Sequence, residues 1–128
     1  MQIEATNVNA LVGILAFLIK DKKSSENLYK NIRKNICIGA HGLFAHTSNE
    51  IGAGIHEHTE DNALIGILAD LLGEIDYAKD IFELINKNVP RDKDGLFGWW
   101  VGDKYSMPEG NCAMVLLAAL LEGMKLTE

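Results

Sequence analysis

Proline, cysteine, aromatic residues and long hydrophobic runs are all scarce in this sequence of 128 residues. It contains two prolines, two cysteines and 7% aromatic residues. Few prolines leave room for long helices, because proline breaks a helix when it lies in the interior. The longest apolar run, residues 8–19, is interrupted by Asn9 and Gly13 and is shorter than the roughly 20 apolar residues of a membrane-spanning helix. We therefore expect a core helix here and no membrane partner.

Positive charge is also in short supply. Twelve lysine and arginine residues stand against eighteen aspartate and glutamate residues, which gives a net charge of −6. Nucleic acids and anionic membranes attract proteins with a basic face, so this balance argues against both. Hydrophobic residues make up 48% of the chain, which is enough for a folded core. The length predicts one domain over residues 1–128.

The two cysteines lie in unlike surroundings and do not form a Cys-x-x-Cys pair. Cys37 falls at the end of an expected helix, and Cys112 lies inside an apolar one. We interpret both as free thiols that mostly pack, in a reducing compartment, with a disulfide between them as the alternative. The segment before Val8 contains Glu4 and no lysine or arginine, unlike a secretory signal peptide. We therefore expect a cytoplasmic protein.

An internal repeat is the strongest signal in the chain. The run Asn9-Ala-Leu-Val-Gly-Ile-Leu-Ala returns 53 residues later as Asn62-Ala-Leu-Ile-Gly-Ile-Leu-Ala. Gly42-Leu-Phe returns as Gly95-Leu-Phe at the same offset, and a third start follows at Asn111. Two separated matches in one register indicate about two and a half copies of one structural unit. The units lie near residues 7–60 and 61–109, followed by a last helix.

The hydrophobic pattern in each unit predicts a pair of helices. The first helix of each pair, near residues 7–20 and 61–72, is apolar almost all round, which predicts burial on most sides. The second helix, near residues 25–36 and 75–88, has one apolar face. The last helix, 110–124, is again apolar all round.

Single residues mark the ends of these elements. Ser24 or Ser25 is the expected cap of the helix at 25–36. Gly73 is the expected break between the helices of the second pair. Gly42 and Gly95 permit a turn, and we expect the leucine and phenylalanine that follow each of them to be anchored in the core.

The alternation of the two helix types indicates an inner and an outer layer. An open helical solenoid and a closed ring of hairpins both have such layers. Links inside a pair are short, at residues 21–24 and 73–74, whereas links between pairs are long, at about 37–60 and 89–109. Long connections in compact domains are usually functional. Because both long loops occupy the same position in the repeat, we expect them on one face, with a site there.

Short motifs on these loops resemble six-hairpin toroids of sugar-active enzymes. The segment Asp94-Gly-Leu-Phe-Gly-Trp-Trp100 through Pro108-Glu-Gly-Asn-Cys-Ala-Met114 is similar to the unsaturated glucuronyl and rhamnogalacturonyl hydrolases. Gly42-Leu-Phe-Ala-His46, with Glu60-Asp-Asn-Ala-Leu64, is similar to sugar epimerases of the same toroid type. The resemblance implies an all-α fold of repeated helical hairpins of α/α-toroid type. It also implies activity on a carbohydrate.

The last helix has no outer partner in this pattern. Complete toroids of this kind have twelve helices, whereas the chain offers five. Left exposed, residues 110–124 would form an unusually large apolar patch. We therefore expect a homo-oligomer, a dimer or higher, that buries the last helix and completes a toroid-like ring from several chains.

All four histidines lie in one window of the first long loop. They are His41, His46, His56 and His58, with Glu50, Glu57, Glu60 and Asp61 among or just after them. Imidazole and carboxylate side chains at this spacing could hold zinc or a similar ion. They could instead carry acid–base chemistry, because a histidine beside a carboxylate titrates near neutral pH. A polar loop without special function is the third interpretation. We predict neither a metal nor another cofactor.

The second long loop carries both tryptophans. Trp99 and Trp100 are followed by Tyr105, and the flat faces of such rings suit sugar rings. The alternative is that one tryptophan packs between helix ends while the other anchors an interface. The candidate ligand-binding residues are His41, His56, His58, Trp99, Trp100, Tyr105, Asn62 and Asn111.

Two carboxylates precede matching apolar helices. Asp61 and Glu109 could both point into one funnel, as the two carboxylates of a glycosidase must. Capping and the helix dipole offer another explanation for acidic residues at helix starts. The neighbouring Asn62 and Asn111 have the same ambiguity. We predict Asp61, Glu109 and His46 as the catalytic set.

No phosphate-binding loop, dinucleotide fingerprint or nucleophile elbow is present in the sequence. The sequence therefore predicts a protein that binds a carbohydrate or another polar small molecule at the loop face, with glycosidase- or epimerase-like activity in its catalytic form. The alternative is a non-catalytic structural or interaction module that self-associates.

Overall fold

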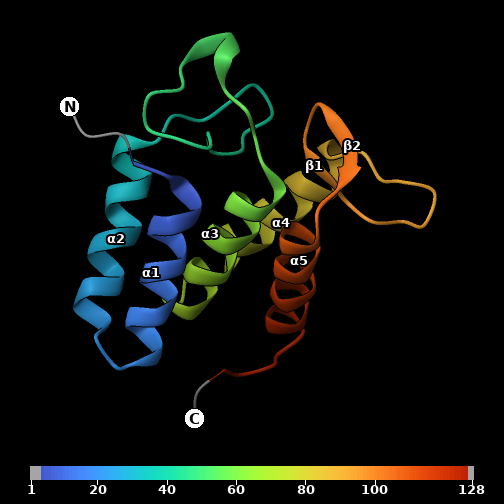
Figure 1. Cartoon of the computed structure of the whole chain (residues 1–128). Helices are drawn as coiled ribbons and strands as arrows, with labels where there is room; N and C mark the ends of the chain where they lie inside the picture. Colours follow the sequence, from blue (N-terminus) through green and yellow to red (C-terminus); the bar gives the residue numbers. More distant parts are fainter. Residues whose placement is uncertain (1–3, 127–128) are drawn as a thin grey trace.

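The computed structural model describes residues 4–126, and this part of the chain is mostly helical (Figure 1). The prediction of an all-α fold is confirmed at this level, with one small antiparallel sheet added. The elements in chain order are α1 (Thr6–Leu18), α2 (Lys22–Asn35), the 3-10 helix η1 (Gly52–Gly54), α3 (Thr59–Leu71), α4 (Ile75–Asn88), β1 (Gly98–Trp100), β2 (Asp103–Ser106) and α5 (Pro108–Leu121).

The α-helices form two layers, and α3 is the helix that contacts all the others. In the first layer α3 packs between α1 and α5, and in the second layer α2 contacts α1 and α3 while α4 contacts α3 and α5. Both long connections lie at one end of the molecule, at the N-terminal ends of α3 and α5 (Figure 1). The apolar periodicity explains the helices: the residues of α4 that face the core, Ala78, Ile81 and Ile85, are spaced by three and four.

The residue that caps the N-terminus of α2 differs from the sequence prediction. Helix α2 begins at Lys22, and the side chain of Asp21 accepts a hydrogen bond from the Ser24 N–H at 3.1 Å. The prediction of Ser24 or Ser25 as the cap is therefore wrong, since a carboxylate three residues earlier satisfies the free N–H groups. The break at Gly73 is confirmed, because this residue has a φ of 86° between α3 and α4.

The expected burial of the apolar helices holds for α3 and fails for α1. Nine of the thirteen residues of α3 are buried. One side of α1 is open instead, because no element of the described chain packs against it. Its exposed side chains are Val8, Leu11, Val12 and Leu15, and Ile19 follows just beyond the helix end.

The two Gly-Leu-Phe turns have the same backbone conformation but differ in the burial of their leucines. Gly42 and Gly95 have φ values of 83° and 84°, as a turn that favours glycine requires. The leucine and phenylalanine after Gly42 are buried, as expected. After Gly95 the phenylalanine is buried, but Leu96 is 45% exposed, so the prediction of a core anchor is wrong for Leu96.

The second long loop contains a β-hairpin that the sequence pattern did not predict. Strands β1 and β2 are three and four residues long, too short for an alternating pattern to be recognisable. Gly98 allows the hairpin to close, since a Cβ there would lie 1.9 Å from the backbone oxygen of Asp103. Val101 and Gly102 form the turn between the strands.

Cys37 and Cys112 are free, as expected, but both are exposed rather than packed. None of the helices in residues 4–126 is long and apolar enough to cross a membrane.

Candidate functional site

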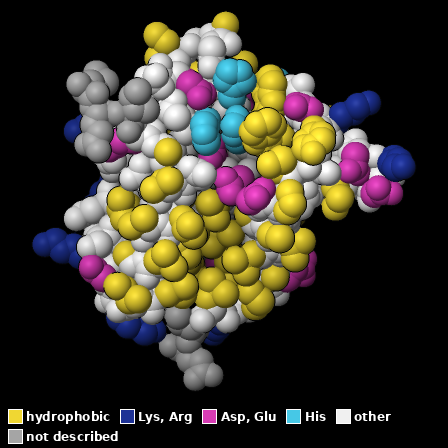
Figure 2. Space-filling model, in the orientation of Figure 1, with side chains coloured by type: hydrophobic (Ala, Val, Ile, Leu, Met, Phe, Trp, Pro, Cys, Tyr) yellow, Lys and Arg dark blue, Asp and Glu magenta, His cyan; other side chains and the backbone are white. Residues whose placement is uncertain are grey.

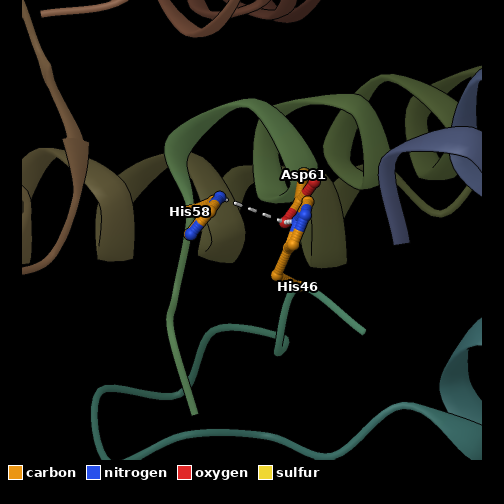
Figure 3. A group of neighbouring side chains, drawn as sticks. All are labelled: His46, His58 and Asp61. Atoms are coloured by element: carbon orange, nitrogen blue, oxygen red, sulfur yellow. Dashed lines mark hydrogen bonds and ion pairs between the residues drawn. The ribbon is translucent and has the colours of Figure 1, made fainter. Parts of the chain in front are cut away.

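A buried aspartate and a histidine form the centre of the candidate site (Figure 3). Asp61 lies in the first turn of α3, where the helix dipole favours a carboxylate. Its Oδ2 is 2.7 Å from Nδ1 of His46, which comes from the first long loop. The Asp61 side chain is 1% exposed and that of His46 is 34% exposed. The aspartate therefore lies behind the histidine and orients its ring.

A second histidine lies against the first. His58 is the N-cap residue of α3, and its ring stacks on that of His46 with centroids 4.4 Å apart and planes 17° from parallel. Its Nδ1 is 3.9 Å from Asp61 Oδ2. Trp99 lies on another side of His58, at a centroid distance of 5.5 Å. Three aromatic rings from two loops thus meet above one carboxylate.

The surroundings shift the pKa values of these groups in different directions. The hydrogen bond that the His46 ring donates to the Asp61 carboxylate raises the pKa of His46. Burial raises the pKa of Asp61 to about 6. Loss of water, together with the charge of the neighbouring His46, lowers the pKa of His58 to about 4. Near neutral pH, His58 is therefore uncharged, and a proton is held between His46 and Asp61.

This cluster opens onto a cavity of about 330 Å³. The cyan histidines in Figure 2 lie beside the hydrophobic surface of the second loop, with acidic side chains next to them. Among residues 4–126, no lysine or arginine lines the cavity. The lining residues are His46, His58, Glu60, Trp99, Met107, Glu109 and Gly110.

The catalytic set expected from the sequence converges here. His46 and Glu109 line the cavity, and Asp61 lies directly behind His46. Of the expected ligand-binding residues, His58 and Trp99 also line it. The histidines come together because the first loop returns on itself before α3, while the hairpin adds the tryptophan.

Other candidate residues lie outside the cavity. His41 Nδ1 is 2.8 Å from Oε1 of Glu57 and so belongs to a loop contact. His56 packs edge-on against Trp100, at 4.9 Å between centroids, and neither is among the residues that line the cavity. Tyr105 is 68% exposed and borders a separate, open hollow beside the hairpin.

Asn62 and Asn111 hold the loops rather than a ligand. The Asn62 side chain accepts a hydrogen bond from the Phe44 N–H at 2.7 Å and donates to the Phe44 and His58 carbonyls. Asn111 makes the same three bonds, with Phe97 and the Met107 carbonyl. Each asparagine thereby fixes one Gly-Leu-Phe turn against the helix that follows the loop.

Glu57 and Glu60 each have a specific role, whereas the sequence marked them only as acidic residues near the histidines. Glu57 is buried and accepts hydrogen bonds from the N–H groups of His41 and Leu43, which shapes the first loop. Glu60 lines the cavity, and its Oε1 accepts a hydrogen bond from Asn7 at 3.0 Å. In the structure residues 57 and 59 are buried whereas residue 56 is exposed, an alternation that the polar sequence around Glu57 does not indicate.

His46, His58 and Asp61 carry metal-ligating atoms within 4.8 Å of one another. The lone pairs of an imidazole lie in the plane of its ring, so a shared metal would have to lie in both ring planes. The two planes are stacked and nearly parallel. The arrangement therefore suits proton transfer better than metal binding.

No family model, curated protein or solved structure matches this chain.

His58 is expected to make the fold acid-sensitive. Its pKa is about 4 in the folded protein and 6.5 in the unfolded chain, so the unfolded chain binds a proton first as pH falls. This contribution, about 3 kcal/mol, is present above pH 6.5 and is lost between pH 6.5 and 4. In His58→Gln, urea unfolding should show a smaller loss of stability over this window. A His58 ring resonance that titrates near pH 6.5 in the folded protein would contradict this.

Proposed function

We propose that the protein binds a small polyhydroxylated molecule of the carbohydrate class and catalyses proton transfer on it. One observation carries the proposal: a histidine oriented by a buried carboxylate, in the wall of a cavity that also presents a tryptophan face. In this role His46 exchanges a proton with the ligand, and Asp61 stabilises the resulting imidazolium. Asp61 is a positioning residue, because its side chain has no access to the cavity.

The geometry favours an epimerase- or isomerase-type reaction over glycoside hydrolysis. A glycosidase needs two carboxyl groups that both contact the substrate. Asp61 cannot serve as one of them, since its Oδ2 is bound to His46. Glu60, which lines the cavity with Glu109, is held in turn by a hydrogen bond from Asn7 to its Oε1. In the proposed reaction, His46 takes the proton from a carbon next to a carbonyl group, and the electron pair moves to the carbonyl oxygen. When the pair returns, the carbon takes a proton that Glu109, the candidate second group, relays from solvent, and His46 releases its own proton to solvent.

The charges around the cavity support a neutral or cationic ligand. Glu60 and Glu109 line it, and no lysine or arginine of the described part of the chain lines it beside them. A ligand carboxylate would face these groups at short range, which is unfavourable in a partly desolvated site. Neutral sugars and amino sugars avoid this repulsion. Uronates, which the hydrolases in the resemblance act on, fit this cavity poorly.

A solvent-exchange screen tests the proposal. Neutral aldoses and ketoses, 2-amino sugars and uronates are incubated with the protein in D2O, and loss of a C–H signal is followed by proton NMR. We expect exchange in a neutral or amino sugar, and none with His46→Asn. No exchange in any sugar together with no thermal stabilisation would overturn the proposal.

Trp99 is expected to contribute directly to binding. Because the Trp99 ring lines the cavity, Trp99→Ala should raise the Kd of a bound sugar about tenfold, as expected for the loss of an aromatic face. Isothermal titration measures this change. Tyr105→Ala is the matched control, an exposed aromatic residue on the same hairpin outside the cavity. Equal effects of both variants would contradict the role of Trp99.

We also propose that the helix pairs belong to an α/α-toroid type of array in a cytoplasmic protein. The repeat is supported by the positive-φ glycines Gly42 and Gly95, which are 53 residues apart, and by the asparagine contacts, which recur at Phe44 and Phe97 with the same spacing. The free cysteines are consistent with a reducing compartment. A non-catalytic module that self-associates is the second candidate function, and the open apolar side of α1 favours it.

A further inference from the structure

In residues 4–126, the first-layer helices α1 and α5 each have an apolar side that no described element covers. Figure 2 shows a continuous hydrophobic area below the histidines. Its most exposed contributors are the open side of α1 and Val115 of α5, which is 71% exposed. No charged residue lies between Glu4 and Lys20 or between Glu109 and Glu122, so no ion would lose water on contact.

The internal repeat shows what normally covers such a side. Leu15 of α1 corresponds to Leu68 of α3 and to Leu117 of α5 when the starting asparagines are aligned. Leu68 and Leu117 are both 0% exposed, whereas Leu15 is 52% exposed. Each later inner helix buries this position against the inner helix before it. Helix α1 presents the same position with no preceding helix among the described residues.

The buried contact is the same in both places. A Cβ built on Gly13 would lie 2.8 Å from Leu68 Cδ2, and one built on Gly66 would lie 2.7 Å from Leu117 Cδ2. The leucine of each inner helix therefore enters a glycine notch on the preceding helix. In α5 the position that corresponds to Gly13 and Gly66 is occupied by Val115, which is exposed.

The α5 edge is uncovered in a complementary way. Around the first turn, Leu84 of α4 lies 3.2 Å from a Cβ built on Gly42, and Leu43 is fully buried. Around the second turn, a Cβ built on Gly95 would meet nothing within 4 Å apart from its chain neighbours. A groove of about 240 Å³ runs beside α5 instead, lined among others by Leu96, Phe97, Met114 and Val115.

We propose that two copies of this chain associate through these edges, with α1 of one copy packed on α5 of the other. Leu15 then takes the place against Val115 of the second copy that Leu68 takes against Gly13 within one chain. Each chain has one edge of each kind, so two copies can satisfy both edges by two identical contacts and stop there. Val115 fills the notch, so the helices lie further apart at this joint than inside the chain.

Opposite charges at the two positions test the pairing. Sedimentation at micromolar concentration should give twice the 14.1 kDa chain mass for the wild type. Leu15→Lys and Val115→Glu should each weaken association at least about tenfold, since each places an unpaired charge in an apolar contact. The double variant should recover association, because the ammonium of one copy then meets the carboxylate of the other. Ile51→Lys, a charge at an exposed loop residue off both edges, should change nothing.

Cysteine cross-linking provides a second test that does not depend on tolerated charges. In a Cys37→Ser and Cys112→Ser background, L15C combined with V115C should form a covalent dimer on oxidation. I51C combined with V115C should not. A monomeric wild type overturns the proposal. Dissociation by Leu15→Lys alone, with no effect of Val115→Glu, would show α1 pairing with α1 and would also overturn it.

Discussion

Replacing Asn62 with alanine is expected to lower the free energy of unfolding by about 3 kcal/mol, through the loss of three hydrogen bonds in the core. The side chain is fully buried and serves both polar groups of the Phe44 backbone as well as the His58 carbonyl. Alanine leaves these groups unpaired away from water, at a cost of about 1–3 kcal/mol each before the site relaxes. Urea unfolding with an unchanged m-value measures the difference.

Asn111→Ala is the matched control for this prediction. Asn111 makes the same three bonds around Phe97, but it is only partly buried, so water can replace the amide. The expected cost is about 1 kcal/mol. Equal costs for the two variants would show that burial does not distinguish the sites. A large loss of activity in Asn62→Ala at full stability would instead indicate that the asparagine contacts a ligand.

His46→Asn is expected to reduce turnover by about 100- to 10,000-fold in the exchange reaction, the range for loss of a positioned acid–base group. Its ring nitrogen Nδ1 is bound to Asp61, so Nε2 is the atom left to meet a ligand in the cavity. The variant should keep its fold, because the side chain is one-third exposed and the backbone contacts of residue 46 remain. The rate of deuterium incorporation at saturating sugar measures the effect.

Asp61→Asn separates positioning from contact with the ligand. The amide keeps the size of the carboxylate but removes the negative charge that raises the pKa of His46. The His46 limb of the pH–rate profile should therefore move to lower pH, with a lower kcat and an unchanged KM. A raised KM would show that Asp61 contacts the ligand. His41→Asn, on the same loop outside the cavity, should leave turnover unchanged.

The helices were predictable from sequence because their apolar spacing reports which face is buried. The stripe of α4 that contains Ile81 and Ile85 was predicted, and both side chains are buried. Which apolar helix has a side left uncovered was not predictable in the same way. Leu15 and Leu68 lie in nearly identical local sequences, yet one is exposed and the other buried. The difference depends on whether a neighbouring helix exists, which no local pattern contains.

The site shows the same limit. Composition pointed to the histidine-rich loop and to the tryptophans, because such residues are uncommon together on one connection. The pairing of His46 with Asp61 could not be inferred, since it requires the loop to fold back across fifteen residues. His46 lines the cavity and His41 does not. The buried carboxylate of Glu57 holds the His41 end of the loop by accepting hydrogen bonds from the N–H groups of His41 and Leu43.

The cavity is built without the second helical layer. Every residue that lines it comes from the loops or from the first turns of α3 and α5, and none from α2 or α4. Lys30 on α2 and Lys79 on α4 face solvent. A dye, a polymer or a solid support attached at these lysines would therefore leave the cavity chemistry intact, and the outer helices offer a practical handle for immobilising the protein.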